Sequence, residues 1–150
     1  VTIVRRAPGS PALDSRRLST MARRMLEALQ LPRAELSVLL TNDETIHELN
    51  AKHRHKDRPT DVLAFPQHEG WPDLEQPVVL LGDVVISLDT AERQARARKR
   101  PLIAEVRWLL AHGLLHLVGY DHATSEEKRA MVAETRRLVR SAPLPSDSVR

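Results

Sequence analysis

Apolar residues recur at helical spacing near both ends of the chain. Between about Asp14 and Leu29 they fall at i, i+3, i+4, i+7, i+8 and i+11, which predicts an amphipathic helix with its arginines largely off the apolar face. A second amphipathic helix is predicted from a capping-box pattern at Thr124 and Glu127 to about Arg140. The last ten residues, 141–150, are expected to form a flexible tail.

Short apolar runs and turn residues define the elements between these helices. Strands are predicted at Thr2–Arg5, Glu35–Leu40, Asp61–Phe65 and Val78–Ser87, the last interrupted by Gly82 and Asp83. Helices are predicted from a capping box at Thr41 and Glu44 through Leu49, from Ser87 or Asp89 to about Arg98, and from Pro101 to Val118. Residues 53–60 and 67–77 are predicted loops. We therefore predict one α+β domain over residues 1–150, with a mixed sheet of about four strands and about five helices.

The composition limits the chemistry that this chain can carry. Its 150 residues are 41% apolar and 29% charged, as in ordinary globular domains, and it contains no cysteine. The missing cysteine excludes disulfides, Cys-ligated zinc and thiol catalysis. The sequence shows neither a secretory signal nor an apolar stretch that could cross a membrane. We expect a cytoplasmic protein without a membrane partner.

The basic residues are mostly arginine, with nineteen Arg against four Lys. Arginine forms forked bonds to phosphate, so the excess is compatible with an anionic partner such as RNA. Only four aromatic residues are present, which disfavours a platform of stacked bases. The run RQARARKR at 93–100 is interpreted either as a solvated helix end or as an RNA-backbone contact.

Three histidines in the run HGLLHLVGYDH, residues 112–122, form the main candidate site. His112 and His116 are four residues apart, so on a helix they lie about 40° apart on one face. Gly119 can end that helix in a left-handed cap, after which the turn can swing His122 toward the pair. Three imidazoles with a fourth position open are typical of catalytic zinc. We predict a metal-dependent hydrolase with one zinc ion, although imidazole also suits nickel.

The same spacing weighs against a peptidase. Zinc peptidases of the metzincin type read H-E-x-x-H-x-x-G-x-x-H, and Gly113 occupies the position of the glutamate that serves as their general base. A carboxylate from elsewhere in the chain could substitute, so a metallopeptidase-like hydrolase stays an alternative. A metal with a purely structural role is the other alternative, although such a site usually has four protein ligands.

Three segments together resemble the YbeY family of bacterial zinc-dependent endoribonucleases. They are HGLLHLVGYDH, the upstream stretch ELNAKHRHKDRPTDVLAFP and the run LLGDVVIS followed by LDTAERQA, and they lie within residues 48–122, which are about half of the chain. The resemblance implies a metalloprotease-like α/β fold whose central helix carries the zinc in a cleft. It also implies single-strand-specific RNA cleavage in ribosomal RNA processing, at the 3′ end of the small-subunit RNA, and in ribosome quality control. The implied partners are ribosomal RNA and the small ribosomal subunit, with no DNA partner expected. With a structural metal, the alternative in this setting is a non-catalytic ribosome-assembly factor.

The resemblance also assigns residues. His112, His116 and His122 match the family's zinc ligands, and Arg54 matches its functional arginine, which we expect in a loop. The chain departs from the pattern where His53 and His55 replace an aromatic residue and a glycine, and where Ala64 stands in place of a frequent serine.

Two side chains have roles that the sequence suggests without deciding them. The guanidinium of Arg54 can grip a phosphate and offset charge in the transition state, while the zinc activates a water molecule. Asp121 either orients a histidine ligand from behind or caps the turn before His122. The residues do not identify a general base.

Overall fold

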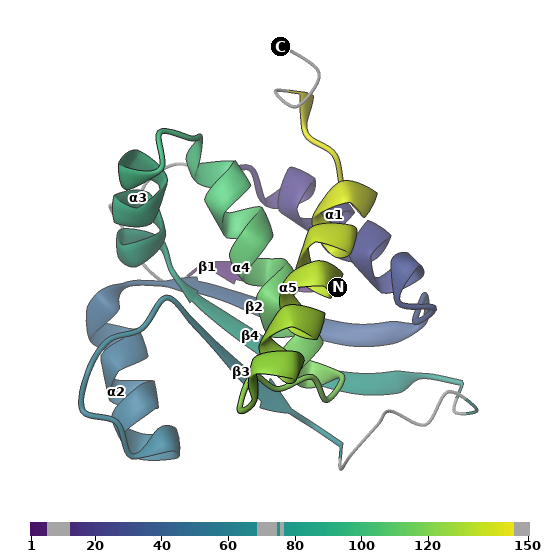
Figure 1. Ribbon diagram of the computed structural model, residues 1–150, viewed down its shortest axis with the longest axis horizontal. Coiled ribbons are helices and arrows are strands. Elements are labelled where there is room, and N and C mark those ends of the chain that lie inside the picture. Colours follow the sequence, from purple (N-terminus) through teal and green to yellow (C-terminus); the bar gives the residue numbers. More distant parts are fainter. Residues whose placement is uncertain (6–12, 69–74, 76, 146–150) are drawn as a thin grey trace.

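A computed structural model describes residues 1–5, 13–68, 75 and 77–145 (Figure 1). Most of the predicted loop at 67–77 lies outside these residues. Along the chain the described elements are β1 (Thr2–Arg5), α1 (Ser15–Ala28), β2 (Ala34–Thr41), α2 (Asp43–Arg54), β3 (Val62–Pro66), β4 (Val79–Ser87), α3 (Leu88–Ala97), α4 (Leu102–Leu117) and α5 (Ser125–Ser141). The predicted α+β class, with a four-stranded mixed sheet and five helices, is confirmed for the described part of the chain.

The sheet has the strand order β1-β2-β4-β3. Strands β1, β2 and β4 run parallel, and β3 pairs antiparallel with β4 at the edge. Helices α1, α4 and α5 lie on one face of the sheet, and α2 lies on the other (Figure 1). Each face therefore has its own apolar cluster, a large one under α4 and a small one where Ile46 of α2 meets Leu63 and Val85. Among the described residues, no helix combines the length and apolar character needed to cross a membrane.

Helix α4 is the centre of the core, as its nearly uniform apolar pattern predicts. Eleven of its sixteen residues are buried, and they face the sheet, α1, α3 and α5. Helix α4 packs tightly on the sheet at Gly113, where a Cβ atom would lie 2.7 Å from Cγ1 of Val84 and 3.3 Å from Cγ2 of Val62. The absence of a side chain at Gly113 lets the helix lie directly on β4 and β3.

The two amphipathic helices pack beside α4. Helix α1 buries its predicted apolar face and begins after Asp14, whose side chain accepts hydrogen bonds from the backbone of Arg16 and Arg17. Helix α5 begins after Thr124, which accepts from the backbone of Glu127 at 3.1 Å, as the capping box predicts. Residues 141–145 do not form the predicted tail, because Ser141 ends α5 and the next residues include the buried Ala142 and Leu144. Residues 146–150 lie outside the described part.

Helix α2 differs from its prediction at both ends. Thr41 is the last residue of β2, and Asn42 caps the helix by accepting a hydrogen bond from the backbone N–H of Thr45 at 2.9 Å. At the other end α2 continues past Leu49 to Arg54. The apolar periodicity stops at Leu49, but the helix continues, because the basic residues that follow interact favourably with the negative C-terminal end of the helix dipole. Arg54 therefore lies in the last turn of a helix, and its expected place in a loop was wrong.

The fourth predicted strand forms as one element, although Gly82 and Asp83 interrupt its apolar run. Strand β4 carries an irregularity just before Gly82, because the consecutive residues Glu35 and Leu36 of β2 pair with Leu80 and Gly82 and leave Leu81 as the extra residue. Gly82 has φ of +139°, and a Cβ there would run into the backbone carbonyl of Phe65 on β3. Here glycine marks a close approach between two strands rather than the end of one.

The basic run at 93–100 lies at the end of α3 and in the link to α4. Arg93 pairs with Asp43 at 2.7 Å, and Arg98 and Arg100 both bind the fully buried carboxylate of Glu105. A buried carboxylate requires such partners, since an unpaired charge in the core is costly. These arginines hold helices together, which favours the structural interpretation of the run over an RNA contact.

Replacing Gly113 by Ala should destabilise the fold. The new methyl group would collide with Val84, and overpacking of this kind costs about 1–3 kcal/mol, against a gain of up to about 1 kcal/mol in helix propensity. Urea unfolding of Gly113→Ala, Val84→Ala and the double variant tests this contact. We expect the double variant to be more stable than the sum of the single effects predicts; strictly additive effects would contradict the contact.

Candidate metal centre

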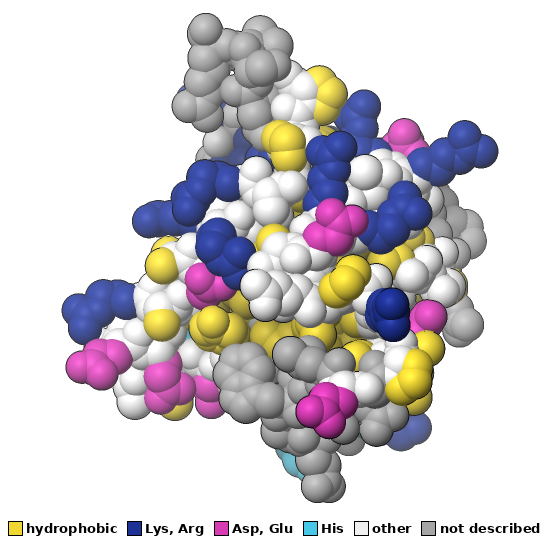
Figure 2. All heavy atoms as spheres, turned by 90° about the vertical axis from the view of Figure 1, so that its right-hand side faces the viewer, with side chains coloured by type: hydrophobic (Ala, Val, Ile, Leu, Met, Phe, Trp, Pro, Cys, Tyr) yellow, Lys and Arg dark blue, Asp and Glu magenta, His cyan; other side chains and the backbone are white. Residues whose placement is uncertain are grey.

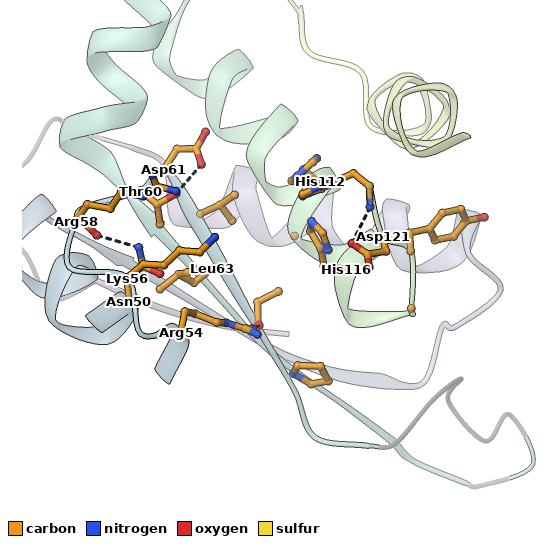
Figure 3. Close-up of a pocket in the computed structure, with 17 residues that line it drawn as sticks. Asn50, Arg54, Lys56, Arg58, Thr60, Asp61, Leu63, His112, His116 and Asp121 are labelled. Atoms are coloured by element: carbon orange, nitrogen blue, oxygen red, sulfur yellow. Dashed lines mark hydrogen bonds between the residues drawn. The ribbon is translucent and has the colours of Figure 1, made fainter. Parts of the chain in front are cut away.

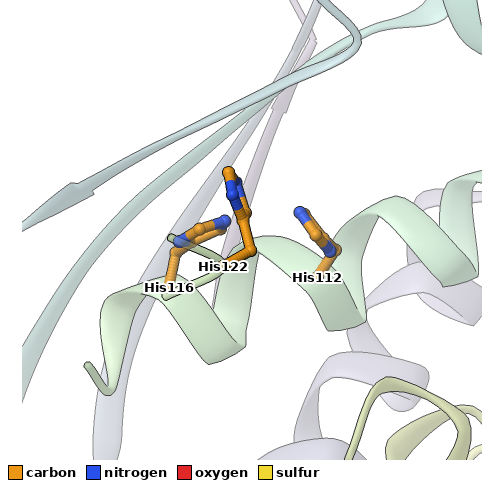
Figure 4. Close-up of side chains that lie close together, drawn as sticks. All are labelled: His112, His116 and His122. Carbon is orange, nitrogen blue, oxygen red and sulfur yellow. The ribbon is translucent and has the colours of Figure 1, made fainter. Parts of the chain in front are cut away.

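The three predicted histidines come together at the C-terminal end of α4. One ring nitrogen from each of His112, His116 and His122 lies within 4.8 Å of the other two. The ring centroids are 4.9 Å apart for His112 and His116, 5.3 Å for His116 and His122, and 6.3 Å for His112 and His122. Figure 4 shows the rings facing a common space. Three nitrogen donors at this separation could hold one metal ion, which fits the chemistry of the donor set.

The turn after α4 brings the third histidine to the other two. Gly119 has φ of +108°, and its N–H donates to the carbonyl of His116, while the N–H of Tyr120 donates to the carbonyl of Leu115. These two bonds form a Schellman motif, in which the helix stops and the chain reverses. Gly119 thus has the predicted left-handed role.

Burial keeps the two helical histidines neutral. It is the main cause that lowers the pKa of His112, and together with repulsion from His112 and His122 it lowers the pKa of His116 to about 4. A neutral imidazole offers a nitrogen lone pair to a metal ion, whereas a protonated one cannot. Both side chains are therefore in the ligand-competent form at neutral pH.

A cleft of about 600 Å³ adjoins the three histidines (Figure 3). Its opposite wall includes Arg54, whose guanidinium donates to the backbone carbonyl of Ala64 and lies 5.3 Å from the ring centroid of Phe65. An arginine has five donor hydrogens, so these contacts fix the guanidinium and leave donors for an anion. The structure therefore places all four predicted site residues around one cleft.

The structure accommodates the two histidines, His53 and His55, at which the chain departs from the family pattern. His55 follows α2 in the left-handed region, with φ of 57° and ψ of 32°, the conformation for which glycine is best suited. The ring of His53 stands edge-on to Phe65, with centroids 5.3 Å apart, as an aromatic residue would. The end of α2 thus keeps its shape with histidine at both positions.

Asp121 acts on the backbone of the turn. Its carboxylate accepts a hydrogen bond from the N–H of His122 at 2.7 Å. This contact supports the turn-capping interpretation. A role for Asp121 in orienting a histidine ring stays a prediction.

Sequence reasoning missed several polar residues of the cleft, namely Asn50, Lys56, Arg58 and Asp61. Asn50 is 2% exposed, and its side chain donates to the carbonyl of Arg58 at 2.9 Å, which folds the loop back over α2. The negative charge of Asp61 opposes the fall in the pKa of His112. The signal available in the sequence was the density of charges between Lys52 and Asp61, which predicted a solvated loop instead of a cleft wall.

His68, in the loop predicted at 67–77, is only partly exposed, and both of its ring nitrogens are shielded from solvent without a hydrogen-bond partner among the described residues.

Comparison with known proteins agrees with this geometry. Residues 9–142 match the family model described as endoribonuclease YbeY. The chain belongs to the endoribonuclease YbeY family. It is 48% identical over 136 residues to endoribonuclease YbeY of Anaeromyxobacter sp. (strain Fw109-5), covering 91% of this chain and 69% of that protein. The Aquifex aeolicus relative of the same name is 48% identical over 116 residues, covering 77% of this chain and 75% of its own length.

A plant relative and a solved structure also match this chain. A chloroplastic endoribonuclease YBEY of Arabidopsis thaliana is 48% identical over 105 residues, which cover 70% of this chain and 18% of that protein. The solution structure of TM1509 from Thermotoga maritima superposes with a TM-score of 0.62 at 26% identity, covering 94% of this chain and 87% of the other. The fold is therefore one that has been observed experimentally.

The lowered pKa of His116 predicts how stability depends on pH in the metal-free protein. Between about pH 6.5 and pH 4 the unfolded chain binds a proton at this histidine and the folded chain does not. The free energy of unfolding should therefore fall as the pH decreases through this window. Urea unfolding of chelator-treated wild type and His116→Gln should show a weaker pH dependence in the variant. Equal dependence in the two proteins would contradict the prediction.

Proposed function

We propose that this chain cleaves single-stranded RNA at one zinc ion held by His112, His116 and His122. The family membership supports a hydrolytic nuclease that acts on RNA and has a role in ribosomal RNA processing. The observation that carries the proposal is the convergence of three ring nitrogens beside a cleft whose far wall presents an arginine. As the finer role, we propose maturation of the 3′ end of small-subunit ribosomal RNA and ribosome quality control, with the small subunit as partner.

The side chains around the cleft have two different roles, metal binding and phosphate binding. His112, His116 and His122 would hold a divalent ion, which would supply Lewis acidity toward a phosphate and lower the pKa of a water molecule. The histidines hold their lone pairs toward one point, because burial keeps His112 and His116 neutral. Arg54, fixed by Ala64 and Phe65, is suited to bind a non-bridging phosphate oxygen and to offset the charge that grows there in the transition state.

The packing of Gly113 disfavours the peptidase alternative. A glutamate at this position would have to enter the contact with Val84, where even one Cβ atom has too little room. The general base of a metzincin-type peptidase therefore cannot be restored here without moving α4 away from the sheet.

Loss of one histidine tests the metal requirement. We expect purified His116→Ala to bind less than one zinc ion per chain and to lose RNA cleavage, because two imidazoles hold zinc far more weakly than three. His47→Ala is the matched control, since His47 lies on α2, pairs with the exposed Asp57 and is not part of the three-histidine group. Metal analysis and cleavage of an unstructured RNA measure both effects.

Two results of this experiment would overturn the proposal. Metal-free protein that cleaves RNA as fast as the zinc-loaded protein would leave the metal with a structural role, as in an assembly factor. Cleavage of casein but not of RNA by the zinc-loaded protein would favour the peptidase alternative.

Removal of the guanidinium should affect turnover rather than metal binding. We expect Arg54→Ala to reduce kcat by about 10²–10³-fold, the usual effect of removing a donor to a developing oxyanion, with its zinc content unchanged. Arg54→Lys should recover only part of the rate, because an ammonium cannot reproduce the forked geometry. Arg24→Ala, an exposed arginine on α1, controls for loss of one positive charge. An unchanged kcat in Arg54→Ala would remove its assigned role.

A further inference from the structure

Two of the three histidines border a second hollow, on the side of α5. This α5 groove has a volume of about 520 Å³ and shares His112 and His122 with the cleft. Its remaining lining comes from one helix, namely Lys128, Arg129, Met131, Val132, Ala133 and Arg136. In Figure 3, α5 lies on the opposite side of His112 from Arg54 and Lys56. The candidate metal centre therefore has one hollow on each side.

An endonuclease cuts an internal bond, so its substrate strand continues in both directions from the reacting phosphate. The cleft, with Arg54, Lys56 and Arg58, offers a path for one direction. The α5 groove also borders His112 and His122, and it offers a path for the strand in the other direction.

The charge of the α5 groove matches a phosphodiester chain. Lys128, Arg129 and Arg136 line it, and no carboxylate does among the described residues. Of the acidic residues of α5, Glu134 is paired with Arg137 at 2.8 Å, and Glu126 and Glu127 belong to the first turn of the helix and do not line the groove. Eight residues separate Lys128 from Arg136, so the cations extend over about 12 Å of helix. Figure 2, which views the molecule from another side, shows further Lys and Arg side chains spread over the surface, so any test must separate local from general charge effects.

The floor of the α5 groove is apolar. Met131 is buried, whereas Val132 is 40% exposed although it is a large apolar residue. An apolar shelf between cations suits a nucleotide, whose base has an apolar face and whose phosphate is charged.

We propose that the α5 groove binds the part of the single-stranded RNA that leaves the cleft on the far side of the histidines. This inference rests on the proposed function, because it takes the histidines as the point of cleavage.

The test removes the three cations of the groove together. We expect Lys128→Gln/Arg129→Gln/Arg136→Gln to bind a labelled oligouridine about tenfold more weakly at low salt. The slope of log affinity against log salt should decrease in magnitude by up to about 2, because single strands lose about 0.7 per phosphate contact. Fluorescence anisotropy with chelator-treated protein measures binding without cleavage, and the zinc-loaded protein gives kcat and KM.

The matched control removes three arginines from α1. Arg16→Gln/Arg17→Gln/Arg24→Gln makes the same change in net charge on an exposed helix face that lines neither the cleft nor the α5 groove. A second pair tests the apolar floor: Val132→Asp should weaken binding, whereas Leu80→Asp, 56% exposed on β4, should not. Both pairs use exposed positions, and thermal unfolding checks that each variant is folded.

The outcomes separate the two proposals. If the zinc-loaded wild type does not cleave RNA, the proposed function fails, while the anisotropy series still measures whether the groove binds RNA. If the wild type cleaves RNA but the groove variant and the α1 control bind it equally well, the α5 groove is not an RNA site. Support requires a larger loss in the groove variant, expressed as a raised KM on long RNA that diminishes as the strand is shortened.

Discussion

The contact between Gly113 and Val84 determines where the candidate metal centre lies. Without a side chain at Gly113, α4 rests on the sheet, and the ring-bearing face of its last two turns is turned toward the cleft. His112 and His116 flank this contact in sequence, so any displacement of the helix displaces both rings together. The same residue that brings helix and sheet together occupies the position at which a peptidase carries its glutamate, and so one packing requirement constrains both the fold and the chemistry.

The cleft joins two walls of different electrostatic character. On the α4 side, burial suppresses protonation, and neutral imidazoles face one another at short distance. On the α2 side, cations such as Arg54 and Lys56 stay exposed to water. A phosphate placed between the walls would meet metal-binding nitrogens on one side and hydrogen-bond donors on the other. Neither wall alone combines these two properties.

The histidine helix was predictable from sequence because all its information is local. The spacing of His112 and His116 fixes their common face, and Gly119 fixes the turn, whatever the rest of the chain does. The α2 wall was less predictable because its geometry depends on tertiary contacts. Arg54 was assigned by resemblance, but its helical setting was missed, and Asp61 was not recognised because its place in the cleft depends on strand pairing between β3 and β4.

The two walls also differ in how firmly they are anchored. Helix α4 buries most of its length, whereas α2 buries only Ile46 and Asn50 and ends in the left-handed residue His55. A residue other than glycine in that conformation costs about 1–2 kcal/mol. Segments with few buried contacts open at lower free energy than the core. On warming, local unfolding should therefore begin at the arginine side of the cleft, while the histidines keep their arrangement until the whole domain melts.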